Sequence, residues 1–288
     1  ELPARIARGE GLLGDPARGR RETLTVDVAS GKPDAIVVFP GNTVLPIVMA
    51  FVTGGIFVGM LLKIYWLIPI AAAGVLALAL RWAWSQGARP DEGMLPAGHG
   101  LSLPLASASL APPGWWGSLF LLLADVVFMG SLLFGYAFLW TVAPNWPPPA
   151  YLKPGLLGPV LVLGGAALSF GGIRLAQRAL RHDEKPWPGL LLNFAGLVSL
   201  GGAAGTVLAR TVHDAHAFDA TLWVIAGYVI FHVIVAVLMT MFLTLRAVAG
   251  YLSSRRIGEA NIVGLWSDYA AVVALLGLGA AWLPGAFT

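Results

Sequence analysis

Apolar residues in this chain occur in long uninterrupted runs that are separated by short polar segments. A helix needs about 20 consecutive apolar residues to cross the roughly 30 Å hydrocarbon layer of a bilayer, and such runs differ from the alternating patterns of soluble cores. Seven runs approach this length, at about 44–63, 66–84, 115–142, 155–180, 188–211, 218–250 and 262–284. The pattern therefore predicts an all-α membrane protein with seven transmembrane helices.

A polar stretch precedes the first apolar run. Residues 1–43 are rich in Arg, Gly and Pro and are expected to form a cytoplasmic N-terminal segment, not a domain. The alternating stretch at 22–28 is compatible with an extended strand that is too short to fold alone. We therefore expect a partly ordered tail ahead of the membrane helices.

The spacing of the runs divides the helices into two groups. Only Ile64 and Tyr65 separate the first two runs, so residues 44–84 are expected to form a transmembrane helical hairpin. A Pro-rich loop at 85–114 then leads into a five-helix transmembrane bundle at 115–284. This loop is the predicted internal boundary.

Composition agrees with a membrane location. Hydrophobic residues make up 57% of the chain and charged residues 11%, about half the charged fraction of soluble domains. The absence of cysteine excludes disulfides, iron–sulfur clusters, thiolate zinc sites and cysteine nucleophiles. Although the isoelectric point is near 9.4, basic residues flank the apolar runs instead of forming one patch, so we expect no nucleic-acid partner.

Basic residues also predict the orientation of the chain. They precede the first run and follow the second, fourth and sixth runs, at Arg5, Arg8, Arg18, Arg20, Arg21, Arg81, Arg89, Arg174, Arg178, Arg181, Lys185, Arg246, Arg255 and Arg256. The opposite ends carry only Lys63, Lys153 and Arg210. Because cytoplasmic loops are enriched in Lys and Arg, the N-terminus is expected in the cytoplasm and the C-terminus outside.

One acidic residue stands deep inside a predicted helix. Asp125 lies about ten residues into the third run, roughly 15 Å along the helix and near the bilayer middle. Because ionisable side chains are costly in hydrocarbon and usually serve a function, Asp125 is a candidate for proton uptake. An interhelical hydrogen bond that only joins helices is the equally weighted alternative.

Two further polar residues lie within the runs. His232 is well inside the sixth run, where a lone imidazole does not indicate haem or copper, because such a site needs partner ligands on nearby helices. A structural histidine is therefore favoured. Asp268 is near the start of the seventh run, where a packing or interfacial role is expected.

No catalytic or metal-binding motif stands out. His213 and His216, with Asp214 and Asp219 beside them, lie in a short external loop without fixed geometry, so we predict no metal site there. Phosphate-binding loops, nucleophile elbows and paired carboxylates are missing as well. No catalytic residue is predicted.

Two stretches resemble subunit III of the haem–copper cytochrome oxidases. The third run opens with Trp-Trp-Gly at 115–117 and reaches Asp125, where that family has a mid-membrane glutamate. The sixth run contains AGYVIFHVI at 226–234, similar to the family's glycine–aromatic–histidine–x–x–histidine–valine–isoleucine stretch. Arg246 matches the family arginine at the cytoplasmic end of that helix, and His-Ala-Phe at 216–218 resembles its entry.

The chain departs from that family at three places. Val229 replaces the first histidine of the sixth-run pair. Residues 266–269 read WSDY where the family shows tryptophan, histidine and an aromatic residue. Glu259 lies one residue away from the place of the family's glutamate.

The first part of the chain resembles a fused form of these oxidases. In fusions of subunits I and III, a polar linker leads into a helical hairpin, and the linker is similar to this chain at 2–3 (LP), 11–13 (GLL), 21–24 (RETL) and 39–41 (FPG). The resemblance implies that a chain beginning with Glu1 is the C-terminal part of such a fusion.

The resemblance implies a non-catalytic subunit of a respiratory complex that couples oxygen reduction to proton pumping in the bacterial inner membrane. Haem and copper would belong to a partner subunit, with no cofactor in this chain except bound phospholipid. Subunits I and II would be the protein partners. Asp125 would support proton uptake, while Arg246 and His232 would be candidates for binding lipid.

Two other functions remain open from the residues alone. A small transporter or channel is one alternative, although such proteins usually place several charges and broken helices at mid-membrane. A scaffold subunit of another respiratory complex is the second. Purification from the native membrane separates these possibilities, because only an oxidase partner brings haem absorbance with it.

Overall fold

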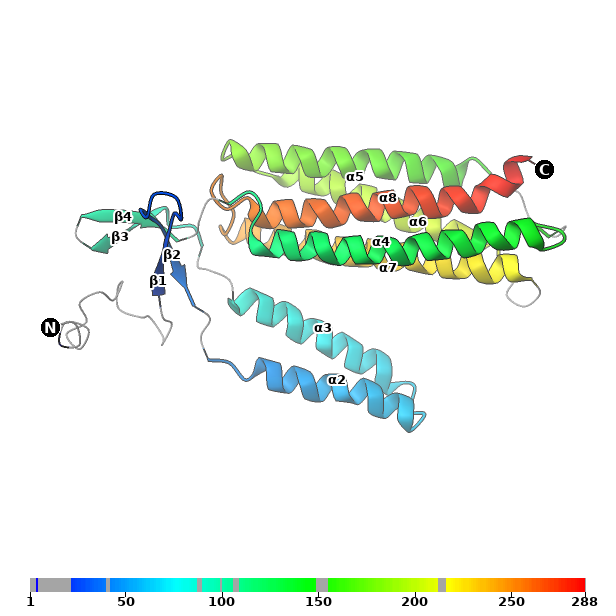
Figure 1. Cartoon of the computed structure of the whole chain (residues 1–288), viewed down its shortest axis with the longest axis horizontal. Helices are drawn as coiled ribbons and strands as arrows, with labels where there is room; N and C mark the ends of the chain where they lie inside the picture. The colour runs from blue at the N-terminus through cyan, green and yellow to red at the C-terminus, as the bar shows by residue number, and fades with distance from the viewer. Residues whose placement is uncertain are drawn as a thin grey trace. The chain divides into compact units, whose positions relative to one another are not determined.

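The computed structural model describes residues 4, 22–39, 42–86, 90–98, 100–105, 109–148, 155–211 and 216–287. Within these residues the chain forms seven long helices and two β-hairpins. They belong to two compact units, Glu1–Ser107 and Ala108–Thr288. Figure 1 labels the elements of both units.

The first unit begins with an antiparallel hairpin of β1 (Glu22–Val26) and β2 (Pro33–Val38). The Asp27 carboxylate organises the turn by accepting hydrogen bonds from the Ser30 hydroxyl and the Ala29 amide. These two bonds favour the ionised form and lower the pKa of Asp27 below its usual value. The extended stretch that the sequence pattern indicated at 22–28 thus contains the strand β1. Its partner strand, β2, was not indicated by the pattern.

A second hairpin occupies part of the segment predicted as a Pro-rich loop. It consists of β3 (Met94–Gly98) and β4 (Leu101–Pro104). β4 contacts β2, and Ile36, Leu103 and Leu105 are the buried residues of a small core shared by the two hairpins. The all-α prediction omitted both hairpins because each is too short to bury an apolar face alone.

The same unit contains the helical hairpin expected from the first two runs. It is formed by α2 (Leu45–Leu61) and α3 (Leu67–Gln86), which pack against each other. Gly59 is the buried residue of α2, and a Cβ there would lie 3.1 Å from Ile68 Cγ1. Lys63 adopts a φ of 58° in the connecting turn. The short connection predicted between the two runs is thus a tight turn.

The second unit is a bundle of five helices, drawn side by side in Figure 1. They are α4 (Pro113–Val142), α5 (Leu157–Arg181), α6 (Trp187–Leu208), α7 (Ala217–Val248) and α8 (Gly258–Phe287). These five and α3 are long and apolar enough to cross a membrane, whereas α2 is a shorter apolar helix. Six described helices thus support the predicted multi-pass membrane character.

α5 and α6 approach each other until their backbones touch. A Cβ added to Gly172 would lie 2.3 Å from the Asn193 amide nitrogen, and one added to Gly189 would lie 2.3 Å from the Ala176 nitrogen. At Gly196 the corresponding distance to a backbone nitrogen is 2.4 Å. Small residues allow this close approach of membrane helices, so these three glycines are required by packing.

A neutral polar network crosses the centre of the bundle. Asn193 on α6 accepts a hydrogen bond from Ser169 on α5 at 2.8 Å and donates to Thr240 on α7 and Ser267 on α8 at 2.9 and 3.2 Å. All four side chains are buried. Because each polar group finds a partner, the network joins four helices without exposing an unpaired group to hydrocarbon.

Candidate functional site

Asp125 lies on α4, a helix with few buried side chains. Its buried residues, Leu122, Met129 and Tyr136, recur every seven positions, so one narrow face packs against α7 and α8. Asp125 follows Leu122 by one turn, and 27% of its side-chain surface remains exposed. The acid therefore stands at the edge of the bundle.

His232 on α7 is the direct partner of Asp125. Its Nε2 lies 2.9 Å from Asp125 Oδ2, and the imidazole is almost completely buried. The two ionisable residues that the sequence singled out separately, on the third and sixth apolar runs, are thus one pair. His232 is satisfied by this contact, as expected for a structural histidine, but its partner is the residue predicted to handle protons.

The backbone of α7 determines which imidazole nitrogen carries a hydrogen. Nδ1 of His232 lies 2.9 Å from the carbonyl oxygen of Tyr228, one turn earlier. A carbonyl only accepts hydrogen bonds, so Nδ1 must be the donor. Nε2 then either accepts from a protonated Asp125 or carries a second proton that faces a carboxylate. His232 and Asp125 therefore share one proton at their contact.

Two tyrosines bind the same oxygen of Asp125. The Tyr269 hydroxyl on α8 donates to Oδ2 across 2.6 Å, and the Tyr228 hydroxyl donates to it as well. With His232, three hydrogen-bonding partners surround one oxygen. In either position of the proton that they share, Asp125 and His232 carry no net charge as a pair.

Sequence reasoning identified the acid and the histidine of this cluster but missed both tyrosines. One local signal was present, because Tyr228 and His232 are four residues apart and therefore share a helix face. No local pattern indicated Tyr269, because its partners Asp125 and Tyr228 lie on other helices, far from it in the sequence. We call Asp125, Tyr228, His232 and Tyr269 the acid cluster.

Arg246, predicted to bind a lipid phosphate, has a carboxylate partner within the chain. Its guanidinium makes two bonds to Glu259, from Nε at 2.6 Å and from Nη2 at 2.7 Å. The Tyr251 ring lies 4.3 Å from the guanidinium carbon, and Arg246 is only 4% exposed. A phosphate at Arg246 would have to compete with Glu259. Lipid binding by Arg246 and His232 stays a prediction.

Asp268 also has a partner that the sequence did not indicate. Its Oδ2 lies 2.5 Å from Nη2 of Arg174 on α5. The pair joins two helices that are far apart in the sequence, and Asp268 accordingly has a bonding role within the bundle. The sequence indicates Arg174 only as one of the basic residues that predict the orientation.

Four potential metal ligands, His213, Asp214, His216 and Asp219, occur in the sequence around the start of α7. His216 caps α7, its Nδ1 accepting a hydrogen bond from the Phe218 amide at 3.1 Å, and its ring stacks at 5.8 Å from that of Trp146. His213 and Asp214 lie outside the described residues. Among the described residues, no group of three His, Asp or Glu side chains is placed to hold a metal ion.

Comparisons with known proteins add no family assignment. No protein-family model matches the chain, and no curated protein matches it. The functional argument therefore depends on the residues and their geometry.

Proposed function

We propose that this chain is the non-catalytic subunit III of a respiratory haem–copper terminal oxidase. In this role it stabilises the catalytic subunit I beside subunit II, holds structural phospholipid and supports proton uptake for oxygen reduction. Haem and copper belong to the partner subunits. The proposed location is the bacterial inner membrane, with a cytoplasmic N-terminus and an external C-terminus.

One observation carries this proposal. Asp125 and His232 come from the two separate stretches that resemble subunit III, and they bond to each other at 2.9 Å. Ionisable residues within membrane helices usually pair, and here the pair consists of the two that lie in the stretches resembling the family. The meeting of the motif residues therefore supports the family and their joint use.

The geometry of the acid cluster suits a proton-handling role. Asp125 and His232 share a proton across one contact, while the tyrosine hydroxyls hold the carboxylate oxygen in place. Because 27% of the Asp125 side chain is exposed at the edge of the bundle, a neighbouring subunit or a water chain can reach it. Intramembrane acids with such access mark proton paths.

Purification of the full-length gene product from its native membrane, in mild detergent, tests the family assignment. We expect stoichiometric haem absorbance bands in the purified complex and oxygen-consuming activity. A colourless protein that moves a solute when reconstituted alone would instead identify a transporter. A protein that copurifies with another respiratory complex would identify a scaffold subunit.

Replacement of Asp125 by Asn tests the role of the cluster within the assembled oxidase. The substitution keeps the size of the side chain and removes the charge, so we expect slower proton uptake and a shorter turnover lifetime. Ser131→Ala is the matched control, because Ser131 lies on α4 and bonds only to the Val127 carbonyl of its own helix. Unchanged proton uptake and lifetime in Asp125→Asn would leave only a packing role.

A further inference from the structure

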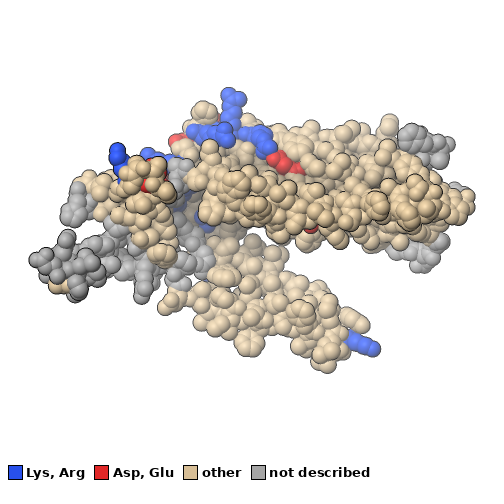
Figure 2. Space-filling view, in the orientation of Figure 1, with Lys and Arg blue, Asp and Glu red and all other residues tan. Residues whose placement is uncertain are grey.

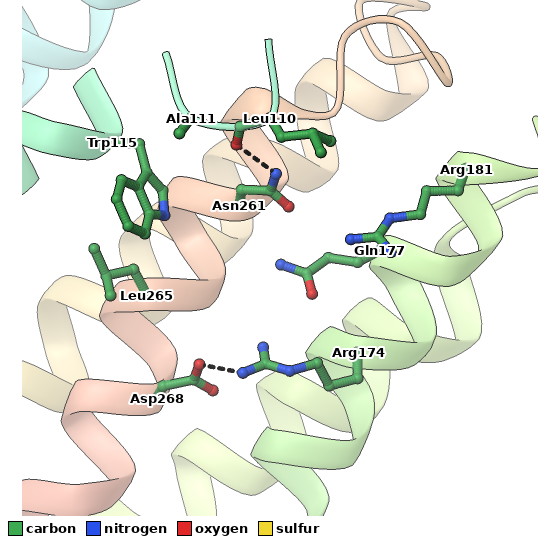
Figure 3. A pocket seen from close by; sticks show the side chains of 9 residues that line it. All are labelled: Leu110, Ala111, Trp115, Arg174, Gln177, Arg181, Asn261, Leu265 and Asp268. Atoms are coloured by element: carbon green, nitrogen blue, oxygen red, sulfur yellow. Dashed lines mark hydrogen bonds and ion pairs between the residues drawn. The ribbon is translucent and has the colours of Figure 1, made fainter. Parts of the chain in front are cut away.

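A pocket with a mixed polar and apolar lining lies between α5 and α8 and is separate from the acid cluster. It is an open pocket of about 370 Å³, and Leu110 and Ala111 of the segment that precedes α4 line part of it. Figure 3 shows its lining side chains, which extend from the two helices toward each other. Its chemistry is unlike that of the surrounding apolar surface.

The α5 wall of the cavity carries three polar side chains on one helix face. Arg174, Gln177 and Arg181 follow at intervals of three and four residues, which aligns them along the helix. In Figure 3, Gln177 lies between the two arginines. Arg181 is the last residue of α5, so the cavity is at the basic end of the bundle, where Figure 2 shows Lys and Arg gathered.

The opposite wall combines polar and apolar groups. Asn261, Leu265 and Asp268 line it from α8, and Trp115 adds an aromatic ring near the start of α4. Tryptophan favours the interface between hydrocarbon and head groups. The cavity thus combines the charged groups of Arg174, Arg181 and Asp268 with the apolar surfaces of Trp115 and Leu265, as a molecule at that interface would require.

Hydrogen-bond donors remain available on both arginines. Arg174 uses one of its five N–H groups on Asp268. Arg181 has no ion-pair partner among the described residues. With the single carboxylate of Asp268, two arginines leave the cavity one net positive charge, which suits a ligand with one negative charge.

The two amide side chains present acceptors instead. Gln177 donates its Nε2 to the Ala260 carbonyl at 3.3 Å, and Asn261 donates its Nδ2 to the Leu110 carbonyl at 2.8 Å. Because carbonyls only accept, these bonds settle the orientation of both amides. Their oxygens are left for a donor, and Figure 3 shows the Asn261 oxygen directed toward the space between the helices.

We propose that this cavity binds the headgroup of a phospholipid that carries one phosphate and a neighbouring hydrogen-bond donor, an ammonium or a hydroxyl. The phosphate bonds to Arg181 and to the remaining N–H groups of Arg174. The donor bonds to the amide oxygens of Gln177 and Asn261, and the acyl chains leave along the apolar side past Trp115 and Leu265. This site is distinct from the lipid candidates Arg246 and His232 and does not depend on the oxidase assignment.

The test uses the full chain, delipidated in detergent and offered phosphatidylethanolamine, phosphatidylglycerol or phosphatidylcholine, with bound lipid counted by native mass spectrometry. We expect the first two to bind more tightly than phosphatidylcholine, whose headgroup has no N–H or O–H donor. Arg181→Gln should weaken their binding about tenfold, the loss expected for a hydrogen bond between a guanidinium and a phosphate. Arg181 is exposed, so this variant should fold normally.

Arg178→Gln is the matched control, since Arg178 lies in the same last turn of α5 but does not line the cavity. Equal loss of lipid in both variants would reduce the effect to general attraction and overturn the proposal. Equal binding of phosphatidylcholine would overturn the role of the amide oxygens. The soluble headgroup glycerophosphoethanolamine should compete only weakly; competition as strong as that of the whole lipid would show a soluble phosphate ester to be the ligand.

Discussion

α6 and α4 are both apolar membrane helices, yet they depend on the bundle in opposite ways. In an apolar 18-residue segment of α6, 44% of the residues are buried, against 11% in the corresponding segment of α4. α6 meets α5 through backbone contacts at glycines, whereas α4 presents large apolar side chains such as Phe120, Val127 and Phe134 outward. One helix is interior, and the other is peripheral.

The polar residues of the two helices also differ, in their burial and in their charge. Asn193 on α6 is neutral, buried and bonded to three other helices, so it contributes cohesion. Asp125 on α4 is ionisable and partly exposed, and its contacts gather on one oxygen. We therefore expect cohesion from Asn193 and, as proposed above, proton handling from Asp125.

The largest expected effect concerns the glycine contacts of the interior helices. Gly172→Ala places a Cβ where the Asn193 backbone already lies, and the forced separation of α5 and α6 should destabilise the bundle by at least about 3 kcal/mol. Loss of helical signal on heating in detergent measures it. Gly171→Ala is the control, because a Cβ there meets nothing within 4 Å; equal destabilisation of both variants would contradict the packing role.

Removal of the central network should have the next largest effect. Asn193→Leu leaves Ser169 and Ser267 without their partner and should lower the stability by about 1–2 kcal/mol, the upper range for hydrogen bonds between membrane helices. The same unfolding measurement applies. If Asp125→Asn cost more stability than Asn193→Leu, the contrast between the interior and the peripheral helix would be reversed.

Asp125→Asn should cost about 1 kcal/mol, because a single amide atom takes the place of Oδ2: an oxygen there still accepts from the tyrosines but offers no proton to Nε2 of His232. Its main effect should be on the proton that His232 shares with Asp125. Nitrogen NMR of His232 at neutral pH should show Nε2 bonded to a shared proton in the native chain and only Nδ1 protonated in the variant. An identical His232 spectrum in both chains would contradict proton sharing at this contact.

The smallest effect is expected from Tyr269→Phe. It removes one of three hydrogen-bonding partners of the same oxygen of Asp125, so the stability should fall by roughly 0.5 kcal/mol. The nitrogen spectrum of His232 should stay that of the native chain. A changed spectrum would show that the tyrosine, and not the histidine alone, sets the position of the shared proton.

The helices were predictable because bilayer thickness imposes a length on apolar runs. The start of the seventh helix was less predictable: α8 begins at Gly258, before the apolar run at 262–284, and Glu259 in its first turn bonds to Arg246. The strands were missed because Ile36 and Leu103 become buried only when both hairpins pack together. Long-range partners leave no local pattern.

The candidate site was predictable only one residue at a time. Asp125 and His232 stood out because ionisable groups are rare in apolar runs. Neither run, however, contains a pattern that indicates contact with the other. Arg174 and Asp268 show the same limit, and so does Asn193, whose neutral amide carries no signal in a Gly-rich helix. Each of these pairs became apparent only from the tertiary structure.

The length of α2 has a consequence for the membrane itself. Its 17 residues span about 26 Å, a few ångströms less than ordinary hydrocarbon thickness, and Tyr65 and Trp66 lie exposed at its far end, where aromatic rings anchor to head groups. If α2 spans a bilayer, the lipids beside it would have to thin to meet its ends. In a membrane of mixed lipids we therefore expect short-tailed lipids to gather beside α2.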